Sequence, residues 1–118
     1  MRRISLCCLA VMLLMLGIAG CAKSLEPSDD GRFHFHGEDL PQIEFLYDPG
    51  SWLMTVSNKT DISAKIKIQS NLESNGISFT LGGFKEHSYH EYYESNSTIH
   101  IAITRLGEIY KFTVKLKY

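Results

Sequence analysis

The stretch that decides the fold is Thr98–Tyr118, TIHIAITRLGEIYKFTVKLKY. From Tyr110 onward, aromatic and aliphatic side chains occupy every second position, with Lys or Thr between them, and Thr98–Thr104 repeats this period with three isoleucines. Successive side chains of a strand point to opposite faces of a sheet, so a period of two predicts strands with one apolar and one polar face. The intervening Arg105-Leu106-Gly107 has turn chemistry, and the whole stretch predicts an antiparallel hairpin.

The same period recurs upstream, most clearly over Asp61–Ser70, where Ile and Ala alternate with Lys, Ser and Gln. Shorter apolar stretches bounded by turn residues predict further strands over Ile43–Tyr47, Ser51–Ser57 and Gly76–Leu81. No window shows a sustained helical stripe of apolar residues. Six or seven short strands predict an all-β fold, a small antiparallel β-sandwich, with a small closed β-barrel as the alternative.

The order of these strands and turns resembles that of known domains. Leu53–Thr60, LMTVSNKT, resembles the opening of bacterial immunoglobulin-like domains. Phe79–Phe84, FTLGGF, followed by the C-terminal hairpin, is similar to the C-terminal accessory domain of bacterial phospholipase C enzymes. The resemblance covers about residues 51–114 and implies an immunoglobulin-like accessory module without chemistry of its own.

The N-terminus has the three-part layout of a secretory signal peptide. Arg2 and Arg3 form a positive head, an apolar run extends over Leu6–Ile18, and Ala19 and Gly20 are small. The run of about 13 residues is shorter than the roughly 20 that a membrane-spanning helix needs. We therefore expect residues 1–20 to be a cleaved leader.

The end of this leader carries a more specific pattern. Ile18-Ala19-Gly20-Cys21 resembles the lipobox of bacterial lipoproteins. The resemblance implies a diacylglyceryl group on Cys21, which becomes the first mature residue, and stable anchoring by two or more acyl chains such as palmitate. Ala22 in place of Asp implies sorting to the outer membrane if the source is Gram-negative. The alternative is an ordinary secretory signal that leaves Cys21 as a free thiol.

Composition excludes several functions for the mature chain. Removing Arg2 and Arg3 lowers Lys plus Arg from 12 to 10, against 13 Asp plus Glu, which gives a net charge of −3. This balance argues against a nucleic-acid partner. Cys7 and Cys8 leave with the leader, so no disulfide is expected. Residues 21–32 predict the lipidated cysteine and a flexible tether, and residues 33–118 predict the β-sandwich domain.

Histidines suggest a metal hypothesis. His34 and His36 would share one face of a strand, and His87 and His90 form a second group. If the fold brought the four imidazoles together, they could bind zinc or copper. The alternative is two solvated polar faces at strand edges, and we expect no resident cofactor.

The segment His87–Glu94 breaks the alternation and predicts a loop, a bulged edge strand or a single helical turn. Its tyrosines, Tyr89, Tyr92 and Tyr93, offer rigid contact surface with hydroxyl groups and are candidate partner-binding residues. The alternative is that they cover one end of the domain. Trp52 is predicted to lie in the core.

No motif for catalysis is present: there is no GxSxG elbow and no phosphate-binding loop. The sequence therefore predicts a lipid-anchored protein of the cell envelope that binds another envelope protein without catalysis, as an inhibitor, immunity protein or complex component. The C-terminal strand, with Lys115 and Lys117, could offer its edge to a partner strand. The alternative function is binding or delivery of copper or zinc.

Overall fold

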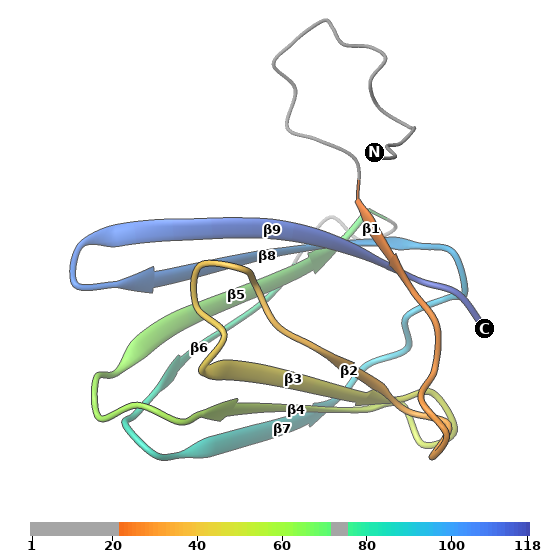
Figure 1. The fold of residues 1–118 in the computed structure, drawn as a ribbon, viewed down its shortest axis with the longest axis horizontal. Helices are drawn as coiled ribbons and strands as arrows, with labels where there is room; N and C mark the ends of the chain where they lie inside the picture. The colour runs from red at the N-terminus through yellow and green to blue at the C-terminus, as the bar shows by residue number, and fades with distance from the viewer. Residues whose placement is uncertain (1–21, 72–75) are drawn as a thin grey trace, which may run out of the picture.

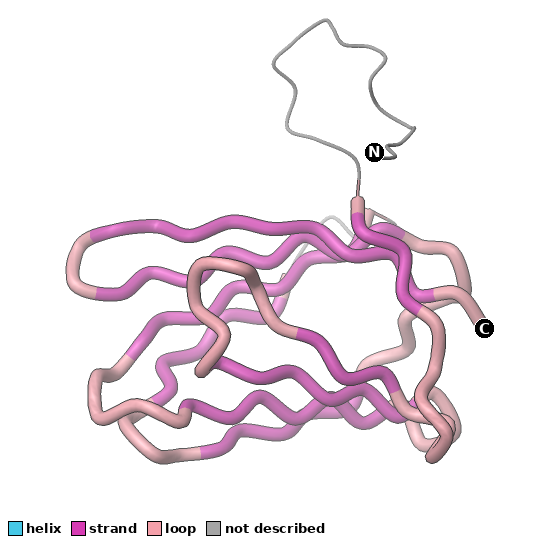
Figure 2. Tube along the Cα trace, in the orientation of Figure 1, coloured by secondary structure: helices cyan, strands magenta, loops and turns pink. Residues whose placement is uncertain are grey.

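The computed structural model describes residues 22–71 and 76–118 and consists of two packed β-sheets (Figure 1). The predicted leader, residues 1–20, and the predicted lipidation site Cys21 lie outside the described residues. Among the described residues the strands are β1 (Lys23–Leu25), β2 (Phe33–Phe35), β3 (Ile43–Asp48), β4 (Leu53–Asn58), β5 (Ala64–Ser70), β6 (Ile77–Leu81), β7 (Glu86–His90), β8 (Thr98–Arg105) and β9 (Glu108–Leu116). Figure 2 shows strands joined by loops, and within this part of the chain no helix is long and apolar enough to cross a membrane.

The two sheets confirm the predicted β-sandwich. One sheet has five strands in the order β1-β9-β8-β5-β6, and the other has four in the order β2-β3-β4-β7. Because both sheets end in open edges, the alternative of a closed barrel is wrong. In the immunoglobulin fold, strands A, B and E of one sheet face strands G, F and C of the other. Here the order β3-β4-β7 in one sheet and β9-β8-β5 in the other corresponds to the orders A-B-E and G-F-C.

The C-terminal hairpin forms as predicted. β8 and β9 pair antiparallel from Thr98↔Lys115 to Arg105↔Glu108, and β8 also pairs with β5. The three isoleucines of β8 are buried, with at most 2% of their surface exposed. Leu106 and Gly107 connect the strands with φ values of 52° and 79°. Two central residues with positive φ are typical of a type I′ turn, whose twist matches that of the flanking strands.

The core is aliphatic on one sheet and aromatic on the other. β5 and β8 supply isoleucines, while β2 and β3 supply Phe33, Phe35, Phe45 and Tyr47. Phe35 stacks on Phe45 with ring centroids 5.2 Å apart, and Phe45 meets Phe112 of the opposite sheet edge-on at 5.8 Å. Each such side chain contributes about 1.5–3 kcal/mol when removed from water. This burial fixes which face of every strand points outward.

The flexible tether predicted for residues 21–32 is wrong for Lys23–Leu25. These residues form β1, which pairs parallel with Val114–Leu116 of β9. Leu25 packs against the core, and the Lys117 N–H donates to the Leu25 carbonyl at 2.9 Å. Backbone pairing with β9 and one bulky side chain hold this otherwise polar segment on the domain. Because β1 covers this part of β9, the predicted partner-binding edge of the C-terminal strand is also wrong there.

The β8–β9 turn gives a stability prediction. Leucine in a left-handed conformation costs about 1–2 kcal/mol, whereas Asn-Gly is the preferred type I′ pair. Leu106 is 77% exposed, so its replacement removes no core packing. Leu106→Asn should raise the free energy of unfolding by about 1 kcal/mol, which raises the melting temperature by about 4–8 °C.

Calorimetry of Leu106→Asn beside Leu106→Ala checks this expectation. The alanine variant loses the same side chain but keeps the backbone strain, so its stability should change by less than about 0.5 kcal/mol. Equal stability of the two variants would contradict the argument.

Candidate interaction surfaces

An exposed aromatic pair lies at one end of the sandwich. Trp52 ends the β3–β4 connection and Tyr92 follows β7; these connections lie at the same end in Figure 1, on the right. Their ring centroids are 5.1 Å apart, and the two residues are 51% and 50% exposed. The prediction that Trp52 lies in the core is therefore wrong. The alternation of β4 begins only at Leu53, after the turn has directed the indole outward.

The backbone holds Trp52 in a strained conformation. Its φ of 60° is an outlier for a bulky residue and costs about 1–3 kcal/mol. The preceding turn is fixed by Asp48, whose carboxylate accepts from the Gly50 N–H at 3.0 Å and the Ser51 hydroxyl at 3.1 Å. The Glu91 N–H donates to the Trp52 carbonyl at 2.9 Å. These bonds join the two connections that carry the aromatic pair.

Beneath this pair, tyrosine hydroxyls form a buried network. The Tyr47 hydroxyl donates to the Glu91 carbonyl at 2.9 Å and accepts from the Tyr93 N–H at 3.0 Å. Burial raises the pKa of Tyr47 to about 12 because the phenolate would lose its hydration. Tyr93 is 1% exposed, and its hydroxyl lies 2.9 Å from that of half-buried Tyr89. The Tyr118 hydroxyl also donates to the Tyr93 carbonyl.

Of the three tyrosines predicted to bind a partner, only Tyr92 presents half of its surface. The prediction that Tyr93 contacts a partner is wrong because its side chain is buried. Tyr89 is partly buried and packs against the core. The segment around them is an edge strand followed by a loop: β7 pairs with β4 over Glu86–His90. The apolar–polar alternation fails there because the inner side of this edge strand carries His87, which stays exposed. Its ring centroid lies 4.2 Å from that of Phe79 on the opposite sheet.

The four histidines do not form a joint site. β2 and β7 are the opposite edges of the four-stranded sheet, separated by three inter-strand spacings or about 14 Å. His34 instead pairs with Asp30, with Nε2 and Oδ2 3.1 Å apart, and His36 Nδ1 lies 2.9 Å from the Gly37 carbonyl oxygen. No cluster of three or more metal-ligating side chains occurs in the described ranges. The predicted site of His34, His36, His87 and His90 is therefore wrong.

The two outer faces of the sandwich carry opposite charge. Strand register places four lysines on the outer face of the five-stranded sheet, which we call the lysine face: Lys65, Lys67, Lys111 and Lys115. Outward-pointing residues of its described strands include no Asp or Glu. The outer face of the four-stranded sheet instead carries Glu44, Asp48 and Glu86 and has no lysine in its strands.

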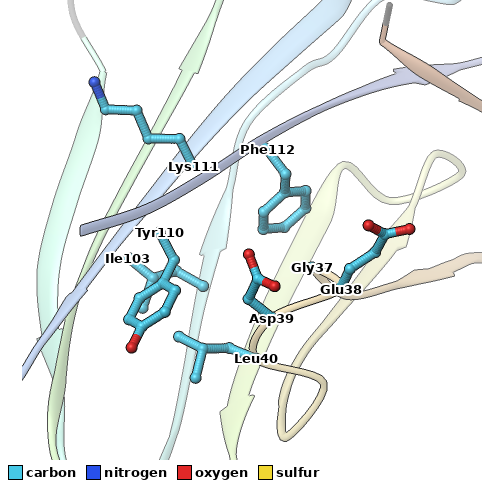
Figure 3. A pocket seen from close by; sticks show the side chains of 8 residues that line it. All are labelled: Gly37, Glu38, Asp39, Leu40, Ile103, Tyr110, Lys111 and Phe112. Atoms are coloured by element: carbon cyan, nitrogen blue, oxygen red, sulfur yellow. The ribbon is translucent and has the colours of Figure 1, made fainter. Parts of the chain in front are cut away.

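The described surface includes a small cavity and an open groove. The cavity in Figure 3 lies where the loop Gly37–Leu40 meets Ile103, Tyr110 and Phe112. Its volume of about 20 Å³ admits one water and excludes a metabolite. The groove, of about 1410 Å³, is open and extends from Lys67, Lys111 and Lys115 of the lysine face to Glu38 and Asp39 of the loop after β2. Neither resembles the deep, mostly apolar pocket of a small-molecule site.

Comparison with protein families, with curated proteins and with solved structures finds no match to this chain. The resemblance to the phospholipase C accessory domain stays a prediction.

The buried hydroxyl of Tyr47 gives a second stability prediction. Tyr47→Phe leaves the Tyr93 N–H without its acceptor inside the protein, which should lower the free energy of unfolding by about 1–3 kcal/mol. Tyr110→Phe is the matched control, because it removes only a solvent-exposed bond to Glu108 and should cost less than about 0.5 kcal/mol. Denaturant titration measures both.

The raised pKa of Tyr47 adds a pH dependence to the same experiment. The unfolded chain releases the Tyr47 proton near pH 10 and the folded chain near pH 12. The stability that the buried, protonated hydroxyl contributes is therefore present below pH 10 and is lost as the pH rises to about 12. Tyr47→Phe should flatten the fall in stability over this window. An unchanged slope would contradict the burial of the hydroxyl.

Proposed function

We propose that this protein is a lipid-anchored component of the cell envelope whose single β-sandwich binds another envelope protein without catalysis. The exposed pair of Trp52 and Tyr92 carries the proposal. Trp and Tyr are the side chains that most often dominate the energy of protein interfaces. They give a large contact area and lose little conformational entropy on binding.

The cost of exposing this pair supports a role in binding. A bulky residue with positive φ needs the surrounding hydrogen bonds to hold it, and such strain concentrates at functional sites. Here the strain holds an indole in water beside a second exposed ring. Underneath, the tyrosine network makes the platform rigid, so a partner would meet a preorganised surface.

The envelope address rests on the sequence. The basic head, the apolar run and Ile18-Ala19-Gly20-Cys21 support cleavage before Cys21 and acylation of its sulfur, with outer-membrane sorting if the source is Gram-negative. An anchored module with one aromatic contact surface suits an inhibitor or immunity protein, or a component of an envelope complex. Metal delivery loses its support because the two histidine pairs lie on opposite sheet edges.

The aromatic pair predicts how partner capture responds to substitution. A photo-crosslinking amino acid placed at Glu94, an exposed residue two positions after Tyr92, should trap one envelope protein, identified by mass spectrometry. Trp52→Ala with Tyr92→Ala should lower its recovery more than tenfold, because interface anchors of this kind contribute 2 kcal/mol or more. Circular dichroism first establishes that the variant is folded.

Lys59→Ala with Lys85→Ala is the matched control. Both are exposed residues of the β4–β5 and β6–β7 connections, which lie at the opposite end of the sandwich in Figure 1. Recovery of the same protein should stay within about twofold of the unchanged chain, since surface residues outside an interface contribute little. Capture that survives the aromatic substitutions and falls in the control would overturn the proposed surface.

A further inference from the structure

β1 determines where the anchor residue meets the domain. Ser24 pairs with Lys115, which belongs to the lysine face. Cys21 precedes Ser24 by three residues and therefore lies at most about 10 Å of extended chain away from it. β1 begins beside β9, on the side of the molecule away from the four-stranded sheet (Figure 1). A lipid on Cys21 would thus place a bilayer next to this face.

The charges of the two outer faces favour one orientation. The strands of the lysine face present four lysines and no outward-pointing carboxylate, and this surplus attracts an anionic surface even with Glu38 and Asp39 at the margin beside Lys111. Glu44, Asp48 and Glu86 on the opposite face are repelled by such a surface. The protein as a whole is not basic, so the attraction comes from this segregation and not from net charge. Each lysine near an anionic leaflet strengthens binding about fivefold.

The far end of the lysine face adds apolar contacts. Ile109 shares the outer side of β9 with Lys111 and is 61% exposed, and Leu106 at the adjoining turn is 77% exposed. Basic side chains beside exposed aliphatic ones are typical of surfaces that rest at the headgroup level of a bilayer. The turn keeps leucine where asparagine would relieve strain, which fits a contact role for Leu106.

We propose that the lysine face binds the anionic headgroups of a lipid bilayer, so that the sandwich lies on the membrane beside its anchor. The orientation relative to the anchor rests on the acylation of Cys21 proposed above, whereas headgroup binding by the face does not. The aromatic pair at the end of the sandwich and the acidic face then remain accessible to a protein partner.

Vesicle binding by residues 22–118 tests the face without the anchor. This segment contains both sheets and the core, and circular dichroism checks that it folds. It should bind phosphatidylcholine vesicles containing phosphatidylglycerol in about 0.1 M salt, should release them in about 1 M salt, and should not bind phosphatidylcholine alone. Lys67→Gln with Lys111→Gln should weaken binding about 25-fold, at about fivefold per lysine.

Lys59→Gln with Lys85→Gln is the matched control, since both are exposed lysines of loops outside the lysine face and the net charge changes equally. It should weaken binding less than threefold. An equal effect of the two double variants, binding to neutral vesicles, or equally tight lysine-dependent binding of soluble polyglutamate would each overturn the proposal. The last result would indicate an acidic protein partner.

The full chain, isolated from membranes and analysed by mass spectrometry, separates this proposal from the proposed function. Acylated Cys21 together with vesicle binding that ignores Lys67 and Lys111 would overturn only the lysine face. Unacylated Cys21 together with lysine-dependent vesicle binding would overturn the lipid anchor and leave the face as a peripheral membrane contact.

Discussion

Burial of β8 between β5 and β9, with its isoleucines against the aromatic side of the opposite sheet, is the constraint on which the structure depends. Most inner positions of these strands are apolar, because a buried polar group loses its hydration and needs a partner. The outer positions are free of this requirement. They carry lysines on one sheet and carboxylates on the other, so the demands of the core leave the molecule with two chemically different faces.

The pairing of β1 with β9 fixes where Cys21 lies relative to the two outer faces of the sandwich. Three residues add to the edge of β9, bury Leu25 and shorten the connection between Cys21 and the domain from a dozen residues to two or three. A long tether would let the domain rotate freely above a membrane. A docked β1 instead fixes which face lies next to Cys21, the residue at which we propose the lipid anchor, and it blunts part of an exposed sheet edge.

Sequence patterns predicted the parts of the fold in which local periodicity and burial agree. Thr98–Tyr118 and Asp61–Ser70 were clear because one face of each strand is buried along most of its length. β1 and β7 were not clear from the sequence. A three-residue strand such as β1 shows no period, and the edge strand β7 has little apolar surface on either face. Both form through pairing with a neighbour that is distant in sequence.

The candidate surfaces were predictable only in part, for the same reason. Tyr92 could be selected by residue type, but its partner Trp52 depends on a backbone conformation that alternation does not encode. The two histidine pairs suggested a metal site from residue type alone, but the strand order places them at opposite edges of the four-stranded sheet. The lysines alternate visibly along β5 and β9, but only the register between strands unites them on one face.

The docking of β1 is tested most directly by hydrogen exchange at the Lys117 amide. This N–H donates to the Leu25 carbonyl at 2.9 Å. The account predicts slow exchange in the full chain and exchange close to that of an unstructured peptide once residues 1–25 are removed. Fast exchange in both chains would show that β1 does not hold the N-terminus on β9, and it would contradict the placement of the anchor beside the lysine face.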